Sequence, residues 1–266
     1  MDISKFWDWL LRRKRSGLTF GCVKDPEDNR DFILGAFLNK RKPIPDQVNL
    51  QQFTHEPGAQ GLLPGCVAWG TAKGMMETVQ TMNNEWSALS VLWLYDQCKR
   101  IDGDPNMEGT YIRTAMKILA QKGCVPEIYL PYDQNYKFGK YDKEIALIPE
   151  QVSRPFRIKT YARLKSVDEM CRCLDQNGPF AMGVEVTEDF IKPDLDGLVI
   201  PLNITEPVGG HCIAAVGFDT AKAAFLIMNS WSTMWGVGGY AWLSFDYWEK
   251  YGLDAWGIID INPNEI

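Results

Sequence analysis

The chain has 266 residues, of which 45% are hydrophobic and 23% are charged, so it is long enough to bury a large core. Its net charge of -6 and its pI near 5.1 leave no basic excess for neutralising phosphates, and we predict no nucleic-acid partner. This length and hydrophobic content also exclude a small disulfide-stapled scaffold. The seven cysteines and two histidines lack zinc-type spacing, and we expect no metal or organic cofactor.

Residues 1–43 are predicted to form an N-terminal arm rather than a compact domain. The positions of Ile3, Phe6, Trp7, Leu10 and Leu11 indicate an amphipathic helix. We expect this helix to dock on the protein's own body; a partner, or a membrane surface contacted through LLRRKR, is the alternative. The rest of the arm is polar and contains Pro, which predicts an extended segment and a candidate pro-segment. The opening lacks the order of a signal peptide, so we expect a cytoplasmic protein, in a host-cell or virion context if it is viral.

The body of the protein is predicted to be one domain over residues 44–266, and its first part, up to about residue 150, is predicted to be mainly helical. Helical spacing of apolar residues covers 66–82 and 87–100, and a third helix is expected over 110–122, where Gly123 stops it. These helices would build one lobe from about residue 50 to about residue 150.

From about residue 151 to residue 261 the pattern changes to short apolar strands. The segments PFAMGVEV, HCIAAVGFD, AAFLIMNSW and GYAWLSF predict four of them, interrupted by a single helix over 166–176. A helical part followed by a strand-rich part indicates an α+β fold with two lobes, and a cleft between lobes is a frequent place for an active site.

Cys66 follows a Gly- and Pro-rich stretch, PGAQGLLPG, and stands at the first position of a predicted helix. A helix N-terminus stabilises a thiolate because its backbone N–H groups carry partial positive charge. A nearby imidazolium would do the same, and His211 is the candidate because it follows two glycines at the start of an apolar strand. Cys66 is therefore a candidate nucleophile, and a buried packing thiol is the alternative interpretation of this residue taken alone.

Asn229 ends another predicted strand, 18 residues after His211, and Trp231 and Trp235 flank it. Its amide oxygen could accept the second imidazole N–H and so fix the tautomer of the ring. The indole rings would shield that hydrogen bond from water.

These segments resemble the papain-like cysteine peptidases, peptidase family C1, and among them the bacterial and viral-type members. The similarity covers roughly residues 44–261, and its segments are IPDQVNL, QGLLPGC, GPFAMGVEVTEDF, GGHCIAAVGFD and NSWSTMWGVGGYAWL. The 145 residues from the Cys to the His fit the family spacing. The resemblance implies two lobes, a helical left lobe and an antiparallel β-barrel-like right lobe, with the active-site cleft between them.

The resemblance also implies the roles of individual residues in an endopeptidase that cleaves polypeptides through an acyl-enzyme thioester. Cys66 would attack the scissile carbonyl, His211 would protonate the leaving amine, Asn229 would orient the His, and Gln60 would supply an N–H to the oxyanion hole. The positions implied for contact with substrate are Gly65, Gly109, Gly210 and Trp231.

Some residues depart from the family pattern. Val67 replaces the usual Trp after the nucleophile, Ser232 replaces the Gly of the Asn-Ser-Trp-Gly motif, and Cys212 replaces a small residue. None of them removes a catalytic atom. Two alternatives therefore stay open: a catalytically silent protein of the same fold that binds peptides or serves in assembly, and a transferase that uses the same thioester.

Overall fold

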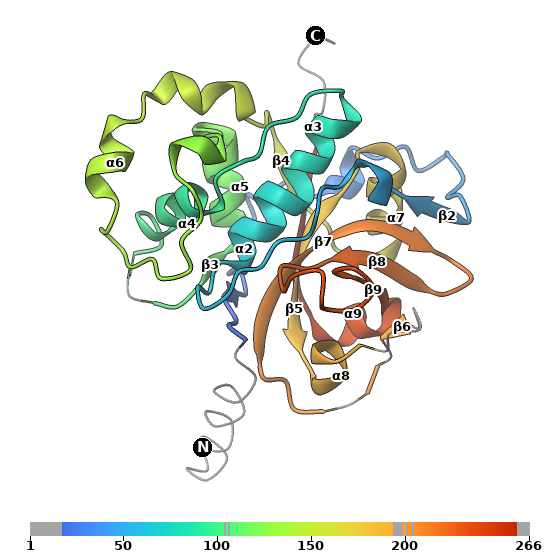
Figure 1. Cartoon of the computed structure of the whole chain (residues 1–266). Helices are drawn as coiled ribbons and strands as arrows, with labels where there is room; N and C mark the ends of the chain where they lie inside the picture. The colour runs from blue at the N-terminus through green and yellow to red at the C-terminus, as the bar shows by residue number, and fades with distance from the viewer. Residues whose placement is uncertain are drawn as a thin grey trace.

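The structure, a computed structural model, describes residues 18–103, 105, 107–193, 199–200, 202–203 and 205–259. It has a helical lobe and a lobe built on a sheet, and the start of the described chain runs between them (Figure 1). The predicted amphipathic helix over residues 3–11 lies outside the described residues. No helix within the described ranges is long and apolar enough to cross a membrane.

The helical lobe is built on the predicted helix over 66–82, which runs through α2 (Cys66–Ala68), the π-helical η3 (Trp69–Glu77) and α3 (Thr78–Met82). The next helix, α4 (Val91–Lys99), begins later than predicted because the Ser90 side chain caps it by accepting the Trp93 N–H. The third, α5 (Ile112–Gln121), begins after a short strand, β3 (Thr110–Tyr111). The shorter helices of this part of the chain are η1 (Leu34–Ala36), η2 (Gln51–Phe53), η4 (Glu127–Tyr129), α6 (Asp142–Leu147), η5 (Glu150–Val152) and η6 (Arg154–Phe156).

The second lobe contains an eight-stranded sheet in the order β4-β10-β5-β7-β8-β9-β6, with β2 also paired to β7. Its strands are β2 (Gln47–Asn49), β4 (Tyr161–Arg163), β5 (Phe180–Val186), β6 (Val199–Ile200), β7 (Gly209–Asp219), β8 (Ala224–Met228), β9 (Tyr240–Ser244) and β10 (Gly252–Ile258). The two-lobed α+β fold is confirmed, but the expected barrel is not. Among the described residues the sheet is open, and β6 pairs with β9 in parallel. The outer strand β6 has only two residues, too short to continue the ladder round to β4.

The prediction of a single helix in this lobe is wrong. Besides α7 (Val167–Gln176) there are α8 (Glu188–Ile191) and α9 (Phe245–Tyr251). Both are too short to give a clear helical period in the sequence. In α9 the Ser244 side chain, which accepts the Tyr247 N–H, marks the start.

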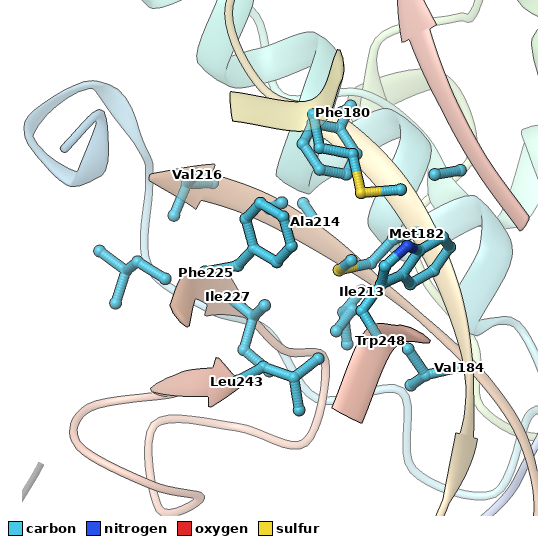
Figure 2. Packing of buried hydrophobic residues seen from close by; sticks show 14 of the residues in the cluster. Phe180, Met182, Val184, Ile213, Ala214, Val216, Phe225, Ile227, Leu243 and Trp248 are labelled. Atoms are coloured by element: carbon cyan, nitrogen blue, oxygen red, sulfur yellow. The ribbon is translucent and has the colours of Figure 1, made fainter. Parts of the chain in front are cut away.

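The sheet packs on both faces. On one face, apolar side chains of β5, β7, β8 and β9 meet Trp248 of α9 (Figure 2). On the other face, the helix over 66–82 lies close to β7: a Cβ added to Gly74 would come within 2.4 Å of the Ala214 Cβ. Only glycine allows this separation, and it brings the start of the helix against the strand that carries His211.

The apolar side of the sheet should dominate stability. Phe225 is fully buried and meets the rings of Phe180 and Phe245 at centroid distances of 6.0 and 4.6 Å. We expect Phe225→Ala to lower the free energy of unfolding by about 3–5 kcal/mol through lost burial and a cavity. Urea denaturation would measure this, with Ile128→Ala, at a side chain that is 85% exposed, as the control. A loss below about 1 kcal/mol for Phe225→Ala would contradict this view of the core.

Candidate active site

Cys66 is the first residue of α2, and its side chain is fully buried. Burial raises the pKa of its thiol, and the nearby backbone N–H groups of Cys212 on β7, Gly21 of the arm and Val67 on its own helix oppose this rise. The contact with the Cys212 amide places the thiol beside the residue that follows His211. The start of the helix that carries Cys66 therefore lies against the strand that carries His211, as the sequence predicts.

His211 and Asn229 form a direct hydrogen bond, with 2.7 Å between the ring Nε2 and the amide Oδ1. The ring of Trp231 stacks on the His211 ring at a centroid distance of 4.4 Å, and all three side chains are buried. Because Asn229 Oδ1 also accepts the Ser230 N–H, the amide orientation is fixed, and Nε2 is the protonated nitrogen of a neutral ring. The other nitrogen, Nδ1, is buried and has no hydrogen-bond partner, so it is the atom free to exchange a proton.

The Gln60 side chain is held at both ends. Its Oε1 accepts the Ser230 hydroxyl at 2.7 Å, which directs its Nε2 away from Ser230. The backbone of this segment is also tied to the strand-like stretch after Asn229, because the Gln60 N–H donates to the Ser230 carbonyl at 2.8 Å. The side-chain N–H groups of Gln60 are therefore held in a fixed orientation, directed toward the arm.

The arm takes up the side-chain N–H groups of Gln60. Gln60 Nε2 donates to both the backbone oxygen and the hydroxyl of Thr19, each at 2.9 Å. The next residue, Phe20, sets its ring edge-on to Trp231 at 6.1 Å. Strand β1 (Cys22–Val23) then pairs in parallel with β3. In Figure 1 this dark-blue segment passes between the helices and the strands β5 and β7.

Of the four residues predicted to contact substrate, Gly109 and Gly210 line the arm. A Cβ on Gly109 would lie 2.2 Å from the Gly21 oxygen, and one on Gly210 would lie 2.2 Å from the Cys22 oxygen. Trp231 contacts the arm through Phe20. Gly65 precedes α2 as its N-cap, and the structure gives it no close contact with the arm.

Burial favours the uncharged forms of Cys66 and His211. Burial raises the pKa of the Cys66 thiol from 9.0 to about 12, and the nearby Cys22 adds to this. Burial lowers the pKa of His211 from 6.5 to about 4, against the opposing effect of its hydrogen bond with Asn229. At neutral pH the docked state therefore contains a thiol and a neutral imidazole, which is an unreactive form of the pair. Among the residues that the structure covers, no cluster of His, Cys, Asp or Glu could hold a metal ion.

A buried charge cluster anchors the arm beyond β1. The Asp25 carboxylate accepts the Arg113 N–H at 3.1 Å and the Trp256 indole N–H at 2.9 Å. The Asp25 N–H donates to Asp254 at 2.6 Å, and Arg163 bridges Asp254 to Asp31 of the arm. These contacts connect the arm to both α5 and β10.

The sequence profile of the papain family of cysteine proteases matches residues 45–256. The chain belongs to this family. It is a thiol protease of the bacterial and viral type, as its sequence predicts. A peptidase C1-like protein of Acanthamoeba polyphaga mimivirus is 26% identical over 288 aligned positions, covering 93% of this chain and 91% of the relative.

Solved structures of papain-family proteases superimpose over most of the chain. Xylellain, a cysteine protease from Xylella fastidiosa, matches with a TM-score of 0.79 and 25% identity, over 91% of this chain and 96% of the other. A procathepsin B from Trypanosoma congolense matches with a TM-score of 0.70 over 94% and 89% of the two chains. At 17% identity, the second comparison shows the fold alone.

Two departures from the family pattern leave the site geometry intact. Ser232 adopts a positive φ of 66°, the conformation for which glycine is favoured, and its N–H still donates to the Gly58 oxygen at 2.8 Å. Val67 is fully buried in the core of the helical lobe. Neither side chain separates His211 from Asn229.

Sequence reasoning missed the residues that act on the site from outside the motifs. Ser230, which orients Gln60, is adjacent to Asn229 and could have been found as a hydroxyl next to a predicted site residue. Thr19, Phe20 and Cys22 carry no local signal, because only the docking of the arm brings them to the cleft.

The anchoring cluster gives a pH dependence with a defined sign. Burial, followed by the charge of Asp254, raises the pKa of Asp25 from 3.8 to about 6. The folded state therefore holds the proton more tightly than the unfolded state. The stabilisation is complete below about pH 4 and is lost as the pH rises to about 6. We expect the free energy of unfolding of the wild type to fall relative to Asp25→Asn over this range, by up to about 3 kcal/mol.

Urea denaturation of the two full-length proteins at pH values from about 4 to 8 would measure this difference. The difference in unfolding free energy between the two proteins should not change above about pH 7, where Asp25 is ionised in both the folded and the unfolded state. A difference that stays constant, or that rises between pH 4 and 6, would show that Asp25 does not titrate as the buried cluster requires.

Proposed function

We propose that the chain is a cysteine endopeptidase that works through Cys66, His211 and Asn229, and that residues 18–34 of its own arm keep it latent. The observation that carries this proposal is the Thr19 carbonyl, held 2.9 Å from Gln60 Nε2. A polypeptide backbone is thus seated on the expected oxyanion donor, beside a helix-start thiol and a His–Asn pair.

The first half of the reaction begins with proton transfer from the Cys66 thiol to Nδ1 of His211. The sulfur then attacks the carbonyl carbon of the substrate, a C–S bond forms, and the electron pair moves to the oxygen. Gln60 Nε2 and the backbone N–H of Cys66 stabilise this oxyanion. The His211 imidazolium protonates the amine as the C–N bond breaks, which leaves a thioester on Cys66.

In the second half, water replaces the amine. Neutral His211 takes a proton from the water molecule as the water oxygen attacks the thioester carbonyl. The C–S bond then breaks, and the Cys66 sulfur is released as the thiolate. The hydrogen bond from Nε2 to Asn229 keeps Nδ1 directed toward the reacting atoms throughout. The stacked Trp231 protects that hydrogen bond.

The arm competes with substrate for the same donors. Its Thr19 oxygen takes the oxyanion position, and its Gly21 N–H lies near the nucleophilic sulfur. A substrate can therefore bind only after the arm has left the cleft, as in a zymogen. The proposed setting is the interior of a cell, where thiols stay reduced.

Activity can be tested in a protein whose arm is displaced without changing a catalytic group. A Cβ at Gly21 would lie 2.0 Å from the Pro64 oxygen, so Gly21→Val should force the arm out of the cleft. In this background, we expect Cys66→Ala and His211→Ala to reduce kcat for a fluorogenic peptide library by roughly 10⁴-fold or more. Gln60→Ala should cost roughly 10²–10³-fold in kcat, as expected for one oxyanion donor.

The matched controls are the second histidine and a thiol in the core of the other lobe. His55→Ala and Cys171→Ala should retain the kcat of the Gly21→Val parent, because His55 pairs with Thr81 and Trp86 and Cys171 lies on α7. Equal activity in Gly21→Val and Gly21→Val/Cys66→Ala would overturn the proposal. Absence of hydrolysis in every variant would favour a catalytically silent peptide-binding protein.

A further inference from the structure

Three of the seven thiols gather around the cleft. Cys22 comes from the arm, Cys66 from the start of α2, and Cys212 from β7. All seven cysteines lie in the described part of the chain, and none of them is in a disulfide there. Cys22 is the one cysteine within residues 1–43, so any thiol bond between arm and body must use it.

Gly183 leaves room for the Cys22 thiol because glycine has no side chain. A Cβ on Gly183 would lie 2.7 Å from the Cys22 sulfur, so the arm thiol sits in the space above this glycine. Gly183 is the direct cross-strand partner of Cys212 in the β5–β7 pairing. Paired residues of antiparallel strands present their side chains on the same face, with Cβ atoms about 4.5–5.5 Å apart. Cys22 and Cys212 are therefore neighbours on the face toward the helical lobe.

The two thiols also interact directly. The contact with Cys212, followed by burial, raises the pKa of the Cys22 thiol well above its usual value. The Cys66 sulfur instead lies near the backbone N–H groups of Cys212, Gly21 and Val67. Cys212 is thus the natural partner of the arm thiol, while Cys66 stays engaged by the backbone.

We infer that Cys22 and Cys212 are the two halves of a reversible disulfide that locks the arm across the cleft. This inference deepens the proposed function and rests on it, because locking matters only if the cleft is catalytic. Under reducing conditions the arm is held by non-covalent contacts and can leave. Under oxidising conditions the bond keeps Thr19 and Gly21 on the catalytic groups.

The oxidant is a low-molecular-weight disulfide, of which oxidised glutathione is the test reagent. When the arm is undocked, the Cys22 thiolate attacks one sulfur of the reagent, forms a mixed disulfide and expels one thiolate. After the arm docks again, the Cys212 thiolate attacks the Cys22 sulfur, the protein disulfide forms, and the second reagent thiolate leaves. Two electrons pass from the protein thiols to the reagent, and the two thiol protons end on the two released reagent thiols.

The test uses the full-length folded protein with oxidised glutathione, followed by denaturation, alkylation and peptide mapping. We expect the wild type to lose two hydrogens, to show five alkylated cysteines of the seven in the chain, and to yield a peptide linking Cys22 to Cys212. Cys22→Ser and Cys212→Ser should give no such link. Cys171→Ser, a control on α7, should keep it.

The functional readout is alkylation of Cys66 by iodoacetamide before denaturation. Oxidation should slow it by roughly 100-fold or more in the wild type, because the tether raises the effective concentration of the arm. A phosphine reductant should restore the rate, and Cys22→Ser should show neither effect.

A link from Cys22 to Cys66, adducts of glutathione alone, or seven alkylated cysteines after oxidation would overturn the inference. The peptide map does not depend on turnover, whereas peptide hydrolysis by reduced Gly21→Val protein tests the proposed function. Failure of one is therefore distinguishable from failure of the other.

Discussion

The site depends on the close approach of one helix to one strand. The helix over 66–82 can lie on β7 because Gly70 and Gly74 face it: a Cβ on Gly70 would lie 2.9 Å from the Cys212 sulfur. Larger residues would push the helix outward. Because β7 also carries His211, the same packing that fills the core brings the start of the helix, where Cys66 lies, against the strand that carries the imidazole. The close approach of the helix to β7 is thus required both for packing of the core and for assembly of the candidate site.

The N-terminal arm fills the space between the two lobes. With the arm seated, Cys66 and His211 are both fully buried, and burial favours the neutral form of each. In the proposed mechanism, the charged form of the pair is thus disfavoured while the arm is seated. Displacement of the arm would expose both groups to water and remove the penalty on charge. Latency in this account has a steric and an electrostatic part.

The sequence was informative where chemistry and local periodicity coincide. The helix over 66–82, the strand that carries His211, the strand that ends just before Asn229, and the two-lobed fold were predictable from spacing and motif. The open sheet, β10 and the short helices α8 and α9 were not, since they depend on pairing and packing between distant segments. The seat of the arm was the least predictable feature. Thr19 and Gln60 are 41 residues apart in sequence and are joined by hydrogen bonds that no local pattern encodes.

The most direct test of the central claim is the rate of Cys66 alkylation by iodoacetamide under reducing conditions, compared between the wild type and Gly21→Val. Phe37→Ala, a change at a half-exposed arm residue, serves as the control. If the arm occupies the site and holds the thiol neutral, Gly21→Val should be alkylated roughly tenfold faster or more, in proportion to the open fraction, and Phe37→Ala should match the wild type. Equal rates in all three proteins would show that the arm does not control the nucleophile.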